Sequence, residues 1–273
     1  TKDALRQVRN QLNAGKLYVL DADIQGFFDE IPHDKLMAKV RRHISDSRVL
    51  QLLESYLKCA TIDQGKSTIP TKGTPQGSII SPLLANLYLN DLDHLMEAQG
   101  YSIVRYADDF IILRDEATQL DLARTEIDRW YKNHGLTLHP EKTEQMEVSR
   151  KAGVEYLGYH FRAHRHWVSK KSLVKMRMKL RPLLGRKQGD SMENLIHKRL
   201  NPILRGMYKY YKHGPSAEMR TIDGWVRMRL RSIKRKKAKR KGRGRGLDHL
   251  RYPNGYFDNL GLFSLEATKE HKI

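Results

Sequence analysis

The sequence predicts a chain of two parts, a mixed α and β first half of α/β or α+β class and a mostly helical second half. In the first half, apolar strand-like runs at 16–24, 101–106 and 110–114 alternate with helical patterns at 33–44 and 117–135. In the second half, helical patterns dominate at 170–185, 191–214 and 221–246, and the clear strands lie in 154–169, where Gly158 and a charged turn predict a hairpin. A length of 273 residues favours two domains, or one domain with an appendage.

Charge is divided unevenly between the two halves. Residues 1–150 hold 19 Lys and Arg against 22 Asp and Glu, whereas residues 151–273 hold 32 against 9. The net charge of +20 favours a polyanionic partner, with nucleic acid as the first candidate and an anionic membrane surface as the second. No apolar run approaches the roughly 18 residues that span a bilayer, and no signal peptide opens the chain, so we expect an intracellular protein outside the membrane. The single cysteine, Cys59, excludes internal disulfides, and its apolar surroundings predict that it is buried.

Two adjacent aspartates interrupt the apolar run IVRYADDFIIL at residues 103–113. The flanking residues have strong β propensity, so we expect a hairpin with Asp108 and Asp109 at its tip. Like-charge repulsion and desolvation make such a pair unfavourable unless a cation or a basic group is close. A divalent cation is one explanation of the pair, and a solvated turn is the other.

A second group of carboxylates lies in the earlier run KLYVLDADIQGFFDEIPH. Asp21 and Asp23 are two residues apart, so both point to the same side of a strand that is expected to end near Gly26. Carboxylates from two strands that converge would suit Mg²⁺, which prefers oxygen ligands and is completed by substrate phosphates. Two such ions activate a 3′-hydroxyl and stabilise a leaving pyrophosphate, which is the chemistry of nucleotidyl transfer.

Several long motifs occur in the order and approximate spacing of the palm motifs of reverse transcriptases. They are DADIQGFFDEIPH, GTPQGSIISPLLANLYLNDLD, VRYADDFIIL, GLTLHPEKTE and VEYLGYHF. The chain most resembles group II intron reverse transcriptase/maturases, and LNPILRGMYKYYK, IDGWVRMRLRSIKRKKAKRKG and RYPNGYFDNLGLFSL are similar to the thumb and maturase-specific domain of that family. The resemblance covers essentially the whole chain. It implies an α+β fold, a right-hand polymerase palm with an antiparallel sheet backed by helices at 1–167, followed by a mostly helical thumb and maturase domain at 168–273.

The resemblance also implies the metal ligands and the cofactor. Asp23, Asp108 and Asp109 correspond to catalytic carboxylates, and the Ile24 backbone carbonyl to an additional ligand. The implied cofactor is a pair of Mg²⁺ ions, for which Mn²⁺ is a substitute.

Other positions are assigned by the same resemblance to nucleotide and primer. Phe28 corresponds to an aromatic residue that packs beneath the sugar and selects dNTPs; alternatively it fills the core, although Phe27 is the better core candidate. Gln76 and Gly77 are placed against the template and the incoming nucleotide, while Leu157 and Gly158 belong to the hairpin that grips the primer end.

Lys142 is also assigned by the resemblance, to a catalytic residue. Its ammonium group would neutralise or protonate the departing pyrophosphate. The alternative is an ordinary surface lysine.

The most basic stretch, 226–246, holds 12 Lys and Arg and no acidic residue. Apolar residues are interleaved in its first part, so we expect a packed helix with a basic outer face, and the glycine-rich end resembles a flexible tail. Such a surface predicts strongly salt-dependent, weakly sequence-selective binding to RNA or an RNA/DNA duplex. The candidate RNA-binding residues are Arg205, Lys209, Arg227, Arg231, Lys234, Arg235, Lys236, Lys237 and Arg240.

The chain departs from the family pattern at its front, where only residues 1–16 precede the first palm strand. We therefore expect a partial or split polypeptide, with a separate N-terminal fingers fragment as a further partner beside intron RNA, the RNA/DNA duplex, dNTP and the DNA target. The expected function is RNA-directed DNA polymerase activity that also assists intron splicing and mobility, in the bacterial cytoplasm or an organelle. The alternative is a non-catalytic RNA-binding maturase or remnant, and a related reverse transcriptase recruited to host defence also fits the sequence.

Overall fold

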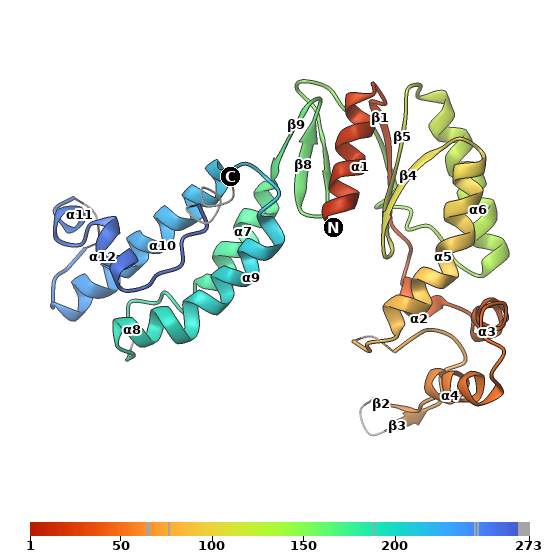
Figure 1. Ribbon diagram of the computed structural model, residues 1–273, viewed down its shortest axis with the longest axis horizontal. Helices are drawn as coiled ribbons and strands as arrows, with labels where there is room; N and C mark the ends of the chain where they lie inside the picture. The colour runs from red at the N-terminus through yellow and green to blue at the C-terminus, as the bar shows by residue number, and fades with distance from the viewer. Residues whose placement is uncertain (64–65, 76, 188, 243, 245, 267–273) are drawn as a thin grey trace. The chain divides into compact units, whose positions relative to one another are not determined.

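The computed structural model describes residues 1–63, 66–75, 77–187, 189–242, 244 and 246–266. Its chain forms two compact units (Figure 1). The first contains residues 1–157 and 162–164, and the second contains residues 158–161 and the chain from Arg165 onward. No helix in the described ranges is long and apolar enough to cross a membrane.

The first unit is built on a four-stranded antiparallel sheet. Its strands are β1 (Tyr18–Ala22), β4 (Ser102–Tyr106), β5 (Asp109–Arg114) and β6 (Glu144–Glu147), in the spatial order β4-β5-β1-β6. Its longer helices are α1 (Lys2–Asn13), α3 (His33–Arg41), α4 (Ser47–Leu57), α5 (Ser81–Ala98) and α6 (Thr118–His134). The short elements are α2 (Phe27–Glu30), β2 (Thr61–Asp63), β3 (Lys66–Thr68) and β7 (Val154–Tyr156). The predicted antiparallel sheet backed by helices is confirmed.

Both faces of the central strands are buried. Leu20, Phe110 and Ile112 belong to a core shared with apolar residues of α5 and α6. Side chains alternate along a strand, so Val19 and Ile111 point to the opposite face, where they are also fully buried. This burial explains the unbroken apolar run at 110–113, since strands covered on both faces do not alternate with polar residues.

Two local features fix the helices on this sheet. Pro82 lies in the first turn of α5, where its missing N–H costs nothing. Helix α6 ends at Gly135, which has a φ of +74°, and a Cβ there would lie 2.7 Å from the Pro32 ring. Cys59, predicted to be buried, is exposed just after α4, because the apolar pattern that suggested burial ends with Leu57.

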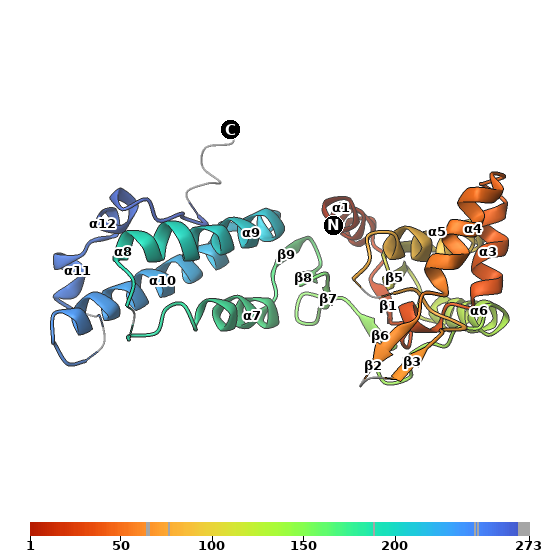
Figure 2. The ribbon, with the colours of Figure 1, turned by 90° about the horizontal axis from the view of Figure 1, so that it is seen from below.

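The second unit is helical. Strands β8 (Tyr159–Arg162) and β9 (Arg165–Val168) precede α7 (Lys170–Leu180), α8 (Met192–Asn194), a π-helical turn (Leu195–Leu200) and α9 (Asn201–Tyr211). The longest helix, α10 (Ser216–Lys237), is followed by α11 (Asp248–Arg251) and α12 (Asn254–Asn259). Figures 1 and 2 show α9 and α10 side by side.

The chain after α12 returns along α10 and is fastened to it by Asp223. This carboxylate is buried and accepts hydrogen bonds from the Ser264 hydroxyl at 2.7 Å and from the backbone N–H groups of Leu265 and Glu266 at 3.0 and 3.1 Å. A buried carboxylate needs such partners, because an unpaired one carries a large desolvation cost. The return segment is thus a fixed part of the described second unit.

Candidate active site and basic surface

Strands β4 and β5 form the predicted hairpin, with Asp108 in its turn. Tyr106 pairs with Asp109, which leaves Ala107 and Asp108 as a two-residue turn. Ala107 has a φ of +59°, the left-handed conformation that tight hairpin turns require. Asp109 is the first residue of β5, so the two carboxylates occupy adjacent but different environments.

Asp23 lies one residue beyond β1, next to the same turn. The pairing of β1 with β5 sets Ala22 opposite Phe110, and continuing this register by one residue places Asp23 across from Asp109. The strand ends at Ala22, earlier than the predicted end near Gly26, and the segment 137–139 then takes over the pairing. Two backbone hydrogen bonds join this segment to residues 23–25: the His139 N–H donates to the Asp23 carbonyl at 2.8 Å, and the Gln25 N–H donates to the Thr137 carbonyl at 3.0 Å.

This pairing bears on the predicted role of the Ile24 carbonyl. Ile24 is opposite Leu138, and the two hydrogen bonds around this pair are made by the neighbouring residues. In an antiparallel ladder such a pair exchanges no backbone bonds of its own. The Ile24 carbonyl therefore accepts no hydrogen bond from this strand pairing, and the Ile24 side chain is buried in the core.

The three aspartates influence one another electrostatically. Burial raises the pKa of Asp109 to about 6, and the charges of Asp108 and then Asp23 contribute to the same shift. The Lys142 ammonium lies 2.6 Å from Oδ2 of Asp23, and this hydrogen bond raises the pKa of Lys142. Lys142 is held near Asp23 because its N–H donates to the carbonyl of His139, the residue that pairs with Asp23.

The oxygen ligands that this site offers suit a hard divalent cation. Ionised carboxylates are acceptors only, and a bound cation would offset the burial and the repulsion that together raise the pKa of Asp109. Over the described residues, no three His, Cys, Asp or Glu side chains already form a group that could hold a metal ion. The Asp23 carboxylate is instead paired with Lys142, so cation binding would require these side chains to reorient.

A cavity of about 610 Å³ opens beside the turn. Phe28, Tyr106 and Asp108 are among the residues that line it, so the predicted sugar-selecting aromatic and one predicted carboxylate face the same space. Phe27 is buried in the core, as predicted for the better core candidate of the two aromatics, and Phe28 is partly buried against the same core. Gly77 has a φ of +84°, and Gln76 lies outside the described residues.

Leu157 and Gly158 form the turn between β7 and β8, with φ values of +49° and +77°. A Cβ at Gly158 would lie 2.8 Å from the Ser172 hydroxyl oxygen, so only glycine fits there without rearrangement. The predicted hairpin is present in 154–168.

The predicted RNA-binding residues separate into two groups. Arg227 pairs with Asp258 at 2.9 Å, Arg235 pairs with Asp248 at 2.8 Å, and Lys234 lies over the rings of Tyr252 and Tyr256. Arg231 is only 2% exposed and donates to the Tyr252 carbonyl and the Asn254 side chain, so its position does not fit the RNA-binding role. These four cations fasten the segment after α10.

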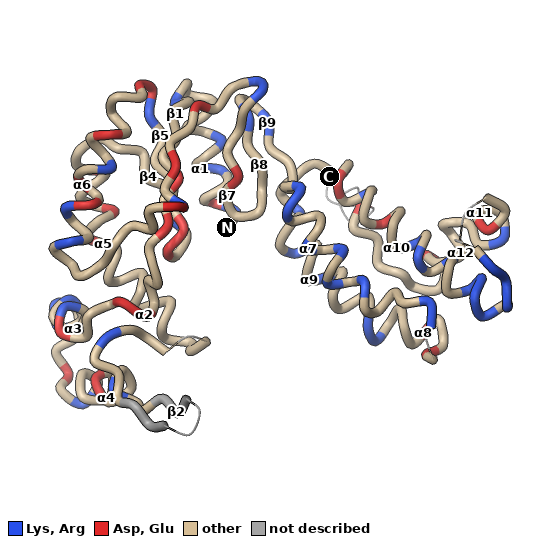
Figure 3. Tube along the Cα trace, turned by 180° about the vertical axis from the view of Figure 1, so that it is seen from behind, with Lys and Arg blue, Asp and Glu red and all other residues tan. Residues whose placement is uncertain are grey.

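The other predicted RNA-binding residues are exposed: Arg205, Lys209, Lys236, Lys237 and Arg240. Figure 3 shows Lys and Arg gathered where α10 ends.

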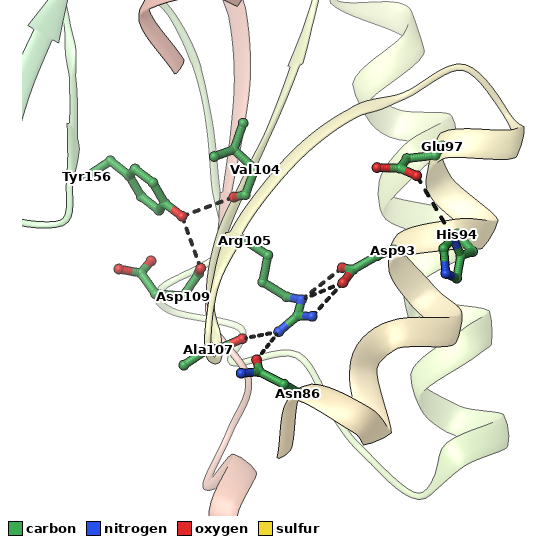
Figure 4. A network of polar contacts seen from close by, with 9 residues as sticks. All are labelled: Asn86, Asp93, His94, Glu97, Val104, Arg105, Ala107, Asp109 and Tyr156. Carbon is green, nitrogen blue, oxygen red and sulfur yellow. Dashed lines mark hydrogen bonds and ion pairs between the residues drawn. The ribbon is translucent and has the colours of Figure 1, made fainter. Parts of the chain in front are cut away.

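Two residues at the turn were not predicted. Arg105 contacts Asp93, Asn86 and the Ala107 carbonyl, and the Tyr156 hydroxyl lies 3.2 Å from the Asp109 carbonyl oxygen and 3.0 Å from that of Val104 (Figure 4). An arginine in an otherwise apolar strand next to two aspartates was the available signal for Arg105, and no pattern pointed to Tyr156.

Comparison with known proteins supports the same reading of the chain. Residues 1–161 match the family described as reverse transcriptase (RNA-dependent DNA polymerase), and residues 173–251 match the group II intron maturase-specific domain. Protein YkfC of Escherichia coli K12 is 31% identical over 57% of this chain and 37% of its own length. The group II intron-encoded protein LtrA of Lactococcus lactis is 37% identical over 33% of this chain and 15% of its own.

The fold resembles that of known polymerases. The RNA-dependent RNA polymerase of a human picorbirnavirus, in an insertion-loop deletion mutant, aligns with a TM-score of 0.59 at 13% identity, covering 100% of this chain and 54% of that one. This similarity concerns the fold alone. The chain spans well under half the length of these curated relatives. Because the family match extends over more than half of the residues, the chain belongs to the reverse transcriptase family and carries a group II intron maturase-specific domain.

Proposed function

We propose that the chain is an RNA-directed DNA polymerase of the group II intron type, which extends a primer 3′-hydroxyl with dNTPs and also assists intron RNA splicing and mobility. The observation that carries this proposal is the convergence of Asp23, Asp108 and Asp109 at one end of an antiparallel sheet, close enough for the first two to help raise the pKa of the third. Residues 1–167 would form the palm, and residues 168–273 the thumb and maturase domain. The partners would be intron RNA, an RNA/DNA duplex and target DNA.

In this proposal Asp23, Asp108, Asp109 and the Ile24 carbonyl hold divalent cations, Mg²⁺ or Mn²⁺. Bound there, the cations would activate the primer hydroxyl and stabilise the charge of the leaving pyrophosphate. Lys142 carries an ammonium group at neutral pH, and its hydrogen bond to Asp23 raises its pKa further, so a positive charge is available for the leaving phosphates. Leu157 and Gly158 would position the primer, while Gln76 and Gly77 would contact template and nucleotide.

Primer extension on poly(rA)/oligo(dT) with Mg²⁺ tests the proposal. We expect DNA synthesis that requires both the RNA template and the divalent cation and that accepts dNTPs in preference to ribonucleotides. Absence of synthesis under conditions in which the chain binds the same template-primer tightly would contradict polymerase activity.

Phe28 provides a test of substrate choice. Substituting Phe28 by Val should raise the incorporation of ribonucleotides relative to deoxyribonucleotides about tenfold, because a smaller side chain leaves room for a 2′-hydroxyl in the cavity that Phe28 lines. The measurement is single-nucleotide extension with dTTP and UTP. Ile103→Ala, which enlarges the same cavity from β4, is the control and should leave the ratio unchanged. An equal change in both variants would mean that Phe28 acts only by filling space.

The exposed cations at the end of α10 provide a test of RNA binding. Replacing Lys236 and Arg240 with Gln should weaken binding to a structured RNA and lower the slope of log affinity against log salt by about 1 to 2, since each phosphate contact releases counterions. The control exchanges Arg124 and Lys132 on α6, also exposed, for Gln, with the same change in net charge. Equal slopes for the two double variants would remove this surface from the proposed interface.

A second candidate function is RNA binding without polymerase activity. It is favoured by the pairing of Asp23 with Lys142 and by the finding that no three acidic, histidine or cysteine side chains within the described ranges are grouped for a metal ion. Binding of Mn²⁺ alone, followed by electron paramagnetic resonance, separates the two candidates. Occupancy that is lost when Asp108 is changed to Asn supports the polymerase, and absence of occupancy supports the RNA-binding protein.

A further inference from the structure

Arg105 is almost completely engaged in hydrogen bonds next to the Ala107–Asp108 turn. Its Nε donates to Asp93 Oδ1 at 2.8 Å and Oδ2 at 3.1 Å, and its Nη2 also donates to Oδ2 of Asp93. Its Nη1 donates to Oδ1 of Asn86 and to the Ala107 carbonyl oxygen, both at 2.9 Å (Figure 4). Every guanidinium nitrogen therefore has an acceptor, and the side chain is only 11% exposed.

The partners of Arg105 connect two different elements. Asp93 and Asn86 lie on α5, seven residues apart and thus on one face of the helix, whereas Ala107 is the first residue of the turn. α5 is anchored in the core by fully buried residues such as Tyr88 and Leu89. Arg105 thereby links the anchored helix α5 to the Ala107 carbonyl in the turn.

The Ala107 carbonyl belongs to the peptide group that leads into Asp108. A peptide group is planar, so fixing the carbonyl of Ala107 also fixes the direction of the Asp108 N–H and restricts where its side chain begins. The turn requires this support, because alanine is strained at a φ of +59°. The Tyr156 hydroxyl contacts the carbonyl of Asp109 from β7, so the backbone is also held just beyond the turn.

Arg105 also lines the cavity beside the turn, which raises the question of direct substrate contact. Its donors are already directed to Asp93, Asn86 and Ala107, and its charge is balanced by the Asp93 carboxylate. A phosphate could recruit this guanidinium only by breaking the bidentate pair, whose two parallel bonds are among the stronger kinds in proteins. These contacts favour a role through the turn.

We propose that Arg105, held by Asp93 and Asn86, is a positioning residue that orients Asp108 for divalent cation binding. The proposal rests on the proposed function, since it gives the carboxylate of Asp108 a ligand's role. Arg105→Gln should weaken Mn²⁺ binding about 10- to 100-fold, as expected when a group that orients a ligand is removed. The rate of primer extension at saturating nucleotide should fall, while the KM for dNTP should change little.

Arg114 provides a matched control at the other end of β5. Its side chain is also largely buried and bridges Gln119 and the Gly100 carbonyl, but it has no contact with the turn. Arg114→Gln should lower thermal stability by a similar amount and leave Mn²⁺ affinity unchanged. A double-mutant cycle completes the design, because Arg105→Gln should cause no further loss of Mn²⁺ affinity in an Asp108→Asn background.

Backbone amide hydrogen exchange at residues 107–109 gives a readout that needs neither metal nor activity. Exchange there should become faster in Arg105→Gln and remain unchanged in Arg114→Gln. If Arg105→Gln does not fold, Arg105→Lys keeps the charge without the bidentate geometry and should show the same changes at smaller size. Equal exchange in both single variants, or a raised KM for dNTP at unchanged Mn²⁺ affinity, would overturn the positioning role. Accelerated exchange in a chain whose wild type neither binds Mn²⁺ nor extends primers would instead contradict the proposed function while leaving the orientation of the turn by Arg105 in place.

Discussion

Replacing Asp108 with Asn is expected to reduce the rate of primer extension by at least about 1,000-fold, because removing a carboxylate ligand loses several kcal/mol of transition-state stabilisation from the cations it holds. The substitution keeps the shape of the side chain and removes one of the charges that repel Asp109. It should therefore leave the fold intact. The rate is measured in a single turnover on poly(rA)/oligo(dT), with the enzyme in excess.

RNA affinity should be little changed in the same variant. The exposed cations that we assign to RNA lie in the second unit, whereas Asp108 lies in the first. Asp115→Asn, which removes an exposed carboxylate from the far end of the β4–β5 hairpin, is the control and should extend primers at the wild-type rate. If Asp108→Asn loses RNA binding and synthesis together, the division of roles between the two units is wrong.

The hairpin and the central sheet could be predicted from local sequence patterns. β-Branched and aromatic residues on both sides of a short polar turn specify a hairpin within about ten residues of chain, and this pattern placed Asp108 correctly in its turn. The alternation of side chains along β1 predicted in part that Asp23 lies near the hairpin. The register that sets Asp23 across from Asp109 could not be predicted, because it depends on pairing between segments far apart in sequence.

The supports of the site could not be predicted in this way. The contact of Arg105 with Asp93 depends on how far α5 extends and on the face with which it packs against β4, both of which are set by the assembled core. The buried position of Arg231 could not be predicted either. It follows Leu230 at the edge of the apolar face of α10, where a charged residue usually reaches solvent. The return segment covers that edge and supplies the Tyr252 carbonyl and the Asn254 side chain, a non-local arrangement that helical periodicity does not contain.

Asp109→Asn is expected to stabilise the metal-free chain at neutral pH by about 2 kcal/mol in the free energy of unfolding. The folded state raises the pKa of Asp109 from its ordinary 3.8 to about 6, through burial first and then through the charges of Asp108 and Asp23. The folded chain therefore binds this proton more tightly than the unfolded chain does. Linkage makes the contribution of Asp109 to stability fall as the pH rises from about 4 to 6, and the loss is complete above that range.

The asparagine variant has no such titration, so its advantage over the wild type should be absent near pH 3.5, grow between pH 4 and 6 and stay constant at higher pH. Urea unfolding in the presence of EDTA measures the free energy of unfolding of both chains at each pH. The titration of all other groups is common to the variant and the wild type, so it cancels in the difference. Adding Mn²⁺ at pH 7.5 should stabilise the wild type more than Asp109→Asn, since a cation relieves the repulsion that the substitution removes. A pH-independent difference for Asp109→Asn would contradict the raised pKa of its carboxylate, and with it the burial of this group beside Asp108 and Asp23.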